Sequence, residues 1–243
     1  MNNTKLLRFI DKYHLGGEIK SVKCVSNGNK LSTSIISGDK SVVGSVVLDK
    51  FDGIDSSELG VYNTSQLISL LTILGDDIKF NLSSAGEKFI SIDMVDTTRN
   101  TKSKYMLSDL SVIPTPPPMK NLPDKFELKL DVTRYFINTF INGKSALPDS
   151  DSFTILCKGG KVNVVIGYSS IASNRVTIPI ETSEYEDIEP ISFNAKMFAN
   201  ILSSNKECES ATLEVSSAGL SRIKFKVDDY SSEYYLVATQ QVT

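Results

Sequence analysis

The sequence predicts an α+β fold made of two tandem copies of one unit, each with two helices packed on antiparallel β-sheets. Three observations predict it: an internal repeat, the same order of helical and strand patterns in both halves, and a proline-rich segment between them. The 243 residues, 40% hydrophobic and 23% charged, suffice for one large or two small domains. We expect an N-terminal unit at 1–110, a connector at 111–125 and a C-terminal unit at 126–243.

The repeat is clearest in a short serine-rich segment. Ser83-Ser84-Ala85-Gly86 recurs 133 residues later as Ser216-Ser217-Ala218-Gly219. Apolar residues alternate after both copies, and an asparagine opens an apolar helical pattern before both, at Asn63 and Asn194. Residues 5–10 also resemble 132–137, and residues 27–31 resemble 158–162. Because these five matches follow one order at offsets of about 126 to 133, chance is a poor explanation.

Hydrophobic periodicity assigns the elements of each unit. Apolar residues at helical spacing predict helices at 3–14, 64–74, 131–142 and 195–204, with Asn63 and Asn194 as N-caps of the second and fourth. Alternating patterns predict strands at 19–26, 30–37, 42–48, 77–83, 88–95 and 102–108, then at 152–157, 161–168, 174–180, 211–217, 221–228 and 232–239. One face of each sheet is therefore expected to be buried and the other wet.

The connector holds five prolines, Pro114, Pro116, Pro117, Pro118 and Pro123. Proline fixes φ and favours an extended path, so the simplest interpretation is a semi-rigid spacer. A second interpretation makes the same segment one wall of a partner-binding groove. A ligand for a proline-reading domain is disfavoured, because no basic residue flanks the prolines in the usual arrangement.

Catalysis finds little support in the sequence. The single histidine, His14, has no Cys or carboxylate cluster at metal-ligand spacing, and Gly159-Gly160 lacks phosphate-loop spacing and is typical of a hairpin turn. The three cysteines are odd in number and far apart, which favours a reducing cytoplasm over a disulfide framework. No apolar run predicts a membrane span or a secretory signal. We therefore expect a protein that is not an enzyme and that has no metal and no cofactor.

Basic residues concentrate on the predicted helices although the net charge is −3. In the first helix Lys5, Arg8 and Lys12 share one stripe by their i, i+3, i+7 spacing. The other basic residues of the set are Arg134 and Lys144 on the third helix and Lys196 on the fourth. Any one of these residues is most simply a solvated helix residue. Together they predict contact with a polyanion through one surface of an otherwise acidic protein.

The chain resembles the DNA sliding clamps. Two tandem helix–strands–helix–strands units with a proline-bearing connector match the two-unit clamps, shared by proliferating cell nuclear antigen and the polymerase clamps of T-even-like tailed phages. The segments Val61-Tyr62-Asn63 to Gly75-Asp76-Asp77, Ile191-Ser192-Phe193-Asn194 and Tyr234-Tyr235-Leu236-Val237-Ala238 resemble the phage version. The resemblance covers nearly the whole chain in order and length.

The resemblance implies a non-enzymatic homotrimeric ring that encircles duplex DNA without sequence preference and tethers the DNA polymerase for processive viral replication. Its further implied partners are an ATP-dependent clamp loader and late-transcription factors, in the cytoplasm of an infected bacterial host. The phosphate-facing set is then Lys5, Arg8, Lys12, Arg134, Lys144 and Lys196.

The resemblance also implies two protein contacts. Subunits are expected to pair through two edge strands. One contains Lys104, Tyr105 and Leu107, and the other contains Val176 and Ile178. Pro179 in the second strand suits an edge position, because proline cannot donate a backbone hydrogen bond in a central ladder. Partner peptides are expected in a groove lined by Leu110, Val112 and Ile113 of the connector and by Val237 and Ala238 near the chain's end.

Two other classes remain open from the sequence. A phage tail or baseplate protein can be a β-rich repeat and an oligomer, but it needs no basic helix stripes. A monomeric processivity factor grips DNA by direct basic contact, which the charge of −3 disfavours.

Overall fold

A computed structural model describes residues 2–119, 122, 125–169 and 174–239. The chain divides into two compact units, each assembled from segments far apart in the sequence. Unit 1 comprises Met1–Ile36, Ser45–Pro117 and Asp228–Ser231, and unit 2 comprises Ser37–Gly44, Pro118–Val227 and Ser232–Thr243. Each unit thus contains a short piece of chain from the sequence range of the other.

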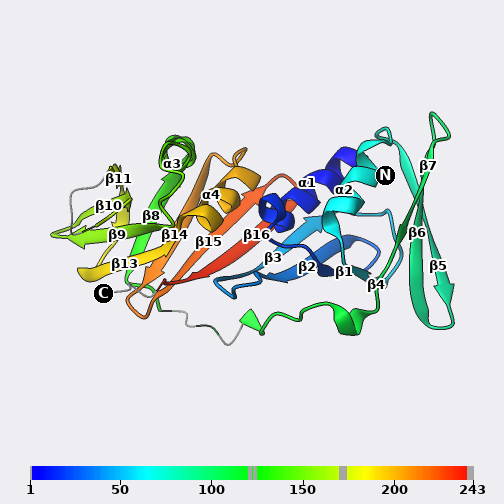
Figure 1. The fold of residues 1–243 in the computed structure, drawn as a ribbon, viewed down its shortest axis with the longest axis horizontal. Coiled ribbons are helices and arrows are strands. Elements are labelled where there is room, and N and C mark those ends of the chain that lie inside the picture. The colour runs from blue at the N-terminus through cyan, green and yellow to red at the C-terminus, as the bar shows by residue number, and fades with distance from the viewer. Residues whose placement is uncertain (1, 120–121, 123–124, 170–173, 240–243) are drawn as a thin grey trace. The chain divides into compact units, whose positions relative to one another are not determined.

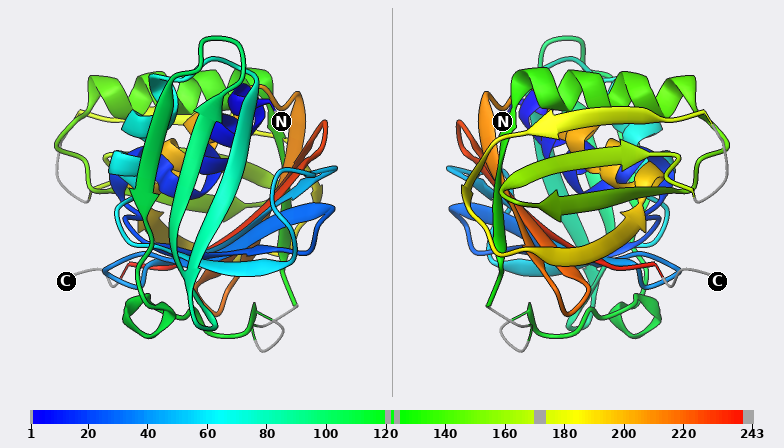
Figure 2. Two further views of the ribbon diagram at one scale, coloured as in Figure 1. Left: turned by 90° about the vertical axis from the view of Figure 1, so that its right-hand side faces the viewer. Right: turned by 90° about the vertical axis from the view of Figure 1, so that its left-hand side faces the viewer.

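Unit 1 has two helices and two antiparallel sheets (Figure 1). Its first sheet has the order β3-β2-β1-β4, and its second, seen face-on in the left view of Figure 2, has the order β5-β6-β7. The elements are α1 (Asn3–His14), a 3₁₀ turn η1 (Leu15–Gly17), β1 (Val22–Ser26), β2 (Lys30–Ile36), β3 (Val42–Asp49), β4 (Ser57–Val61), α2 (Thr64–Thr72), β5 (Ile78–Ala85), β6 (Lys88–Asp96), β7 (Lys102–Met106) and a 3₁₀ turn η2 (Leu110–Val112).

Unit 2 repeats this plan with α3, α4 and two antiparallel sheets, ordered β12-β8-β14-β15-β16 and β11-β10-β9-β13. The second of these sheets faces the viewer on the right of Figure 2, with α3 beside its edge strand β11. The elements are β8 (Leu128–Thr133), α3 (Arg134–Ala146), β9 (Ser152–Lys158), β10 (Lys161–Ile166), β11 (Val176–Ile180), β12 (Thr182–Glu184), β13 (Ile188–Asn194), α4 (Ala195–Ser204), β14 (Ser210–Ser216), β15 (Leu220–Val227) and β16 (Tyr230–Val237).

The second and fourth helices begin where their asparagine caps predict. Asn63 Oδ1 accepts a hydrogen bond from Gln66 N at 3.0 Å, and Asn194 Oδ1 accepts one from Met197 N at 2.9 Å. Each side chain satisfies a backbone donor that has no partner inside the first helical turn. The Gly159-Gly160 turn is also confirmed, because it joins β9 to β10 with both residues at positive φ.

The prediction of a helix at 131–142 is wrong at its start. Residues 128–133 form β8, with Leu128, Leu130 and Val132 fully buried in alternation, and α3 begins only at Arg134. The Thr133 hydroxyl accepts from Phe136 N at 3.2 Å and so caps the helix three residues later than expected.

Both helices of each unit bury one apolar face. In unit 1 Phe9 and Tyr13 meet edge to face at 5.5 Å, and both are fully buried. In unit 2 the ring of Phe198 from α4 stacks on Phe153 of β9 at 4.8 Å and meets Phe140 of α3 edge to face at 4.9 Å. The unit 2 contacts join both helices to β9, whereas the Phe9–Tyr13 pair lies within α1, and in each unit the polar helix faces are left outward.

Candidate nucleic-acid interface

The basic stripe of α1 is paired with acidic residues from the end of the chain. Lys5 Nζ lies 2.9 Å from Asp229 Oδ2, and Arg8 Nη2 lies 3.4 Å from Asp228 Oδ2. Lys50 also approaches Asp229, at 2.9 Å, and hydrogen bonds from the Lys50 and Lys5 ammonium groups lower the pKa of Asp229 to about 2. Lys5 and Arg8 keep 46% and 39% of their side-chain surface exposed, so both can still be reached by a ligand.

The third residue of the stripe does not face outward, which corrects the expectation for Lys12. Its side chain is only 1% exposed, and its Nζ lies 5.3 Å from the centre of the Tyr230 ring. Tyr230 is held over α1 because its hydroxyl donates to the Lys5 carbonyl oxygen at 3.0 Å and its ring lies 4.7 Å beneath the Arg8 guanidinium. The three residues do lie on one side of the helix, as their spacing predicts. Lys12 is nevertheless covered by the segment around Tyr230, which is more than 200 residues away in the sequence.

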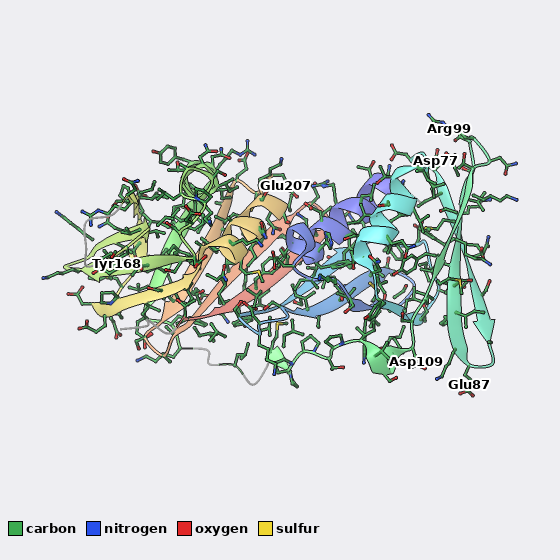
Figure 3. All side chains as sticks on the ribbon, in the orientation of Figure 1. Asp77, Glu87, Arg99, Asp109, Tyr168 and Glu207 are labelled. Carbon is green, nitrogen blue, oxygen red and sulfur yellow. The ribbon has the colours of Figure 1, made fainter. Side chains whose placement is uncertain are left out.

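Unit 2 presents its basic residues on both helices. Arg134 Nη2 lies 3.6 Å from Glu209 Oε1 and donates to the carbonyl oxygen of Glu207, a residue labelled in Figure 3, at 3.4 Å. Lys144 donates to the carbonyl oxygens of Leu147 and Pro148 at 3.3 and 2.7 Å, beyond the end of α3. Lys196 is exposed on α4. Both long side chains of α3 are thus held near the ends of their helix.

Charge is divided unequally between the helices and the rest of the chain. The four helices contain six Lys or Arg residues and a single acidic residue, Asp11, whereas the whole chain has 26 basic and 29 acidic residues. The exposed residues of α2 include Ser65, Gln66 and Ser69, which carry no charge. Lys12 is buried, but the other five basic residues leave the helix faces positive or neutral, and the acidic excess lies on strands and loops.

The strands predicted to join subunits are edge strands. β7 ends the order β5-β6-β7, and β11 ends the order β11-β10-β9-β13. On β7 the side chains of Lys104 and Met106 are exposed, Met106 by 62%, and on β11 Val176 is half-buried and Thr177 exposed. An edge strand leaves one row of backbone N–H and C=O groups without a neighbouring strand, which suits pairing with another copy.

Two of the predicted interface side chains point into their own units. Tyr105 is 3% exposed, and its hydroxyl accepts from Asn63 N at 3.0 Å and donates to Asn63 O at 3.2 Å. Ile178 is 2% exposed. A charge placed at either position would disturb the unit's own core, so neither is a clean probe of a subunit contact. Leu107 is half-buried and follows directly after β7.

The residues predicted to line a partner groove fall in both units. In unit 1 Leu110 is half-buried, Val112 is 58% exposed and Ile113 is 3% exposed. In unit 2 Val237 is 46% exposed, and Ala238 N donates to the Gly219 carbonyl oxygen at 2.8 Å. Gln240 to Thr243, the chain's end, lie outside the described residues. The groove itself stays a prediction.

No catalytic constellation comes together in the part of the chain that the structure describes. His14 is half-buried, its Nε2 lies 3.2 Å from Ser65 Oγ, and burial lowers its pKa. The described His, Cys, Asp and Glu side chains do not gather in groups of three that could hold a metal ion. Cys24, Cys157 and Cys208 are buried free thiols, and burial raises the pKa of Cys24 to about 12, which keeps it protonated at neutral pH. Among the described helices, none has both the length and the apolar character for a membrane crossing.

Sequence reasoning missed the acidic turn at Asp228 and Asp229. Its signal was present, because two adjacent carboxylates follow the alternating strand residues Ile223, Phe225 and Val227. The sequence could not show that this turn lies against the basic face of α1.

The architecture is the PCNA-like clamp fold: four helices on antiparallel sheets in a two-domain arrangement. Among solved structures the chain is similar to the proliferating cellular nuclear antigen from Entamoeba histolytica, with a TM-score of 0.74 at 16% identity. The match covers 98% of this chain and 96% of that one. No protein-family model and no curated protein sequence matches the chain. At this identity the likeness establishes the fold.

Proposed function

We propose that this protein is a DNA sliding clamp, a non-enzymatic ring of three identical subunits that encircles duplex DNA and tethers a DNA polymerase. The observation that carries the proposal is the charge of the helices, which present five basic residues besides the buried Lys12 against one acidic residue in a chain of net charge −3. A full-length likeness to the clamp fold supports it. Topological linkage keeps the polymerase at high effective concentration without tight contacts to DNA.

Subunits in this proposal join head to tail through β7 of one copy and β11 of the next. The support is that both are edge strands and that each presents exposed side chains. A head-to-tail contact repeated by a rotation closes a ring, and three copies of 26.7 kDa would have a mass of roughly 80 kDa.

The setting we propose is the replication of a tailed phage in the bacterial cytoplasm. The support is the resemblance of the segments around Asn63, Asn194 and Tyr234 to the phage clamps. A clamp loader that uses ATP, and late-transcription factors, are the further partners of this proposal. Pull-down with the replication proteins of such a phage, against those of its bacterial host, tests this setting.

Retention on DNA with blocked ends tests the central proposal without a loader. The protein is first allowed to thread onto biotinylated linear DNA, streptavidin then closes both ends, and unbound protein is removed at about 0.5 M NaCl. A ring stays on blocked DNA and leaves DNA with free ends, because high salt weakens contacts but not linkage. Equal loss from both would overturn the topological mechanism, and equal retention on both would favour a monomeric gripping factor.

The molar mass measured by light scattering distinguishes a trimeric clamp from a monomeric processivity factor and from a larger structural assembly. We expect about 80 kDa for the protein and a monomer for Met106→Asp, which places a charge on the exposed face of β7. Ile73→Asp is the matched control, because Ile73 is exposed by 59% at the C-cap of α2 and belongs to neither β7 nor β11. A trimer that survives Met106→Asp would overturn this subunit contact, and a much larger assembly would favour a structural protein.

A further inference from the structure

Strand β4 has a partly open edge in unit 1. It lies at the end of the order β3-β2-β1-β4, so among the described strands it pairs on one side only, with β1. On the other side Ser108 N donates to the Gly60 carbonyl oxygen at 2.9 Å. In an antiparallel strand the N–H and C=O of one residue point to the same side, and the side alternates from residue to residue.

This alternation fixes the direction of the Glu58 peptide groups. Because Gly60 O points away from β1, the N–H and C=O of Glu58, two residues earlier, point away from β1 as well. The described residues provide no hydrogen-bond partner for either group. Glu58 therefore offers one donor and one acceptor to an additional strand.

A cleft of about 360 Å³ opens beside this edge. Its apolar lining comes from three neighbouring segments: Phe89 and Ile90 at the start of β6, Leu107 just after β7, and Leu110 of η2. Ile90 is 40% exposed, and the other three are half-buried. Such a lining, next to free backbone groups, can receive the side chain of a strand that pairs with Glu58.

The rim of the cleft carries excess negative charge. Lys88 and Asp109 pair at 2.5 Å, which leaves the exposed carboxylates of Glu58 and Glu87 without an opposite charge among the described residues. Figure 3 labels Glu87 and Asp109, which both line this cleft. A smaller cleft of about 240 Å³ shares Phe89 and adds the exposed residues Asp52 and Asp55. Acidic residues therefore line both clefts, and the negative charge is not confined to a single side chain.

We propose that the open edge of β4 and this cleft form a docking site for an extended peptide of a partner protein, in which an apolar residue lies between Lys or Arg residues. The peptide adds a strand at Glu58, inserts its apolar side chain between Ile90 and Leu110, and sets its basic residues against Glu58 and Glu87. Backbone pairing supplies affinity, and the pocket and charges supply the choice of sequence. The site lies wholly within unit 1 and shares only Leu110 with the predicted partner groove, whose other residues, Val112, Ile113, Val237 and Ala238, do not line this cleft.

Peptide titration tests this site. The probe is a fluorescein-labelled Lys-Lys-Val-Leu-Val-Lys-Lys peptide, followed by anisotropy on the full-length protein at 50 and 200 mM NaCl. We expect saturable binding that weakens at the higher salt, and slower hydrogen exchange of the Glu58 amide when the peptide is bound. Ile90→Asp should lower the affinity at least tenfold, while Ile73→Asp, another exposed apolar site in the same unit, should leave it unchanged.

Two altered peptides separate the sources of affinity. Glu in place of Lys should abolish binding if the rim selects positive charge, and Pro in place of both Val residues should abolish it if the backbone pairs with β4. No saturable binding, equal affinity for the Ile90→Asp and Ile73→Asp proteins, or an unchanged Glu58 amide would overturn the proposal. If Ile90→Asp instead lowers the mass of the protein without peptide, the occupant is a second copy of the chain and the proposal is likewise overturned.

Discussion

Asp229 joins two lysines that are far apart in the sequence: its Oδ2 lies 2.9 Å from Lys5 Nζ and its Oδ1 lies 2.9 Å from Lys50 Nζ. The carboxylate offsets positive charge on the face of α1 that we propose to meet DNA. A phosphate that binds Lys5 must therefore compete with Asp229. Such exchange favours short-lived contacts, and short-lived contacts permit sliding.

Removing the competing carboxylates should strengthen direct DNA binding. With Asp228→Asn and Asp229→Asn together, Lys5 and Arg8 become available to phosphates, so we expect higher affinity and a salt slope steeper by about 0.9 for each additional phosphate that is neutralised. Anisotropy with a labelled duplex over a salt series measures both. Glu87→Gln changes an exposed carboxylate elsewhere in unit 1 and is the control. Equal slopes in all three proteins would contradict the idea that these carboxylates mask α1.

Lys12 and its neighbours on α1 should behave differently when replaced. Lys5→Ala with Arg8→Ala should reduce the salt slope of DNA binding, because both side chains are exposed. Lys12→Ala should leave the slope unchanged and lower the free energy of unfolding by about 1–2 kcal/mol, because its buried stem packs within unit 1. Lys12→Met retains most of that stem and should recover part of the loss in a urea titration. A Lys12 variant that weakens DNA binding at full stability would show that Lys12 reaches the DNA.

Asp96 should make unit 1 sensitive to acid. Its Oδ1 accepts from Arg99 N at 2.9 Å and Thr98 N at 2.8 Å, and its Oδ2 accepts from Gly75 N at 2.8 Å. The bonds from Arg99 N and Gly75 N lower the pKa of Asp96 below its ordinary 3.8, although burial opposes them. A depressed pKa in the folded state stabilises the protein above the unfolded-state value and ceases to do so as pH falls through the folded-state value.

The corresponding measurement is urea unfolding between pH 7 and pH 3. We expect the native protein to lose stability below about pH 4, and Asp96→Asn to be less stable at pH 7 with a flatter profile in the acid range. Asp52→Asn is the control, because it alters an exposed carboxylate for which no such hydrogen bonds are present among the described residues. Parallel acid profiles for the native protein and Asp96→Asn would contradict this role.

Gly60 should tolerate no side chain. A Cβ atom there would lie 2.3 Å from the Ser108 carbonyl oxygen, which belongs to backbone that cannot turn away cheaply. Gly60→Ala should therefore destabilise unit 1 by about 1–3 kcal/mol and displace the chain between Ser108 and Leu110. Thermal unfolding measures the loss, and Gly38→Ala is the matched control, because its added Cβ would meet nothing within 4 Å. Equal melting temperatures would show that the chain at Ser108 can shift freely.

The sequence was sufficient for the repeat, the fold class and two helix starts, because each is encoded in neighbouring residues. Asn63 and Asn194 cap the helices that follow them, and local side-chain chemistry fixes such positions. The helical prediction over the end of β8 is wrong because Val132 fits a helical spacing with Tyr135 and Phe136. The choice between helix and strand there depends on the sheet that buries Leu128 and Leu130.

Besides β8 and the short β12, the strands β4 and β13 escaped prediction, and each has a physical reason. β13 contains Pro190 where the register with β9 shifts between Ile188 and Ile191, so a bulge accommodates a residue that weakens the strand pattern. β4 contains Gly60, and a glycine inside a strand often marks a close backbone approach. That glycine was the one local sign of the cleft beside β4. The burial of Lys12 had no local sign, because it depends on Tyr230.

The exchange of short segments between the units has a consequence for how the protein is made. Residues 228–231 complete unit 1, yet a ribosome adds them only after residues 1–227 have been synthesised. During synthesis the face of α1 therefore stays uncovered until these residues emerge. The contacts that complete unit 1, such as that of Tyr230 with Lys5, join residues more than 200 positions apart. High contact order of this kind slows folding. A gene divided at the connector would encode two halves that each lack a piece of their own unit. The two copies of the sequence repeat therefore do not correspond to two independently folding proteins.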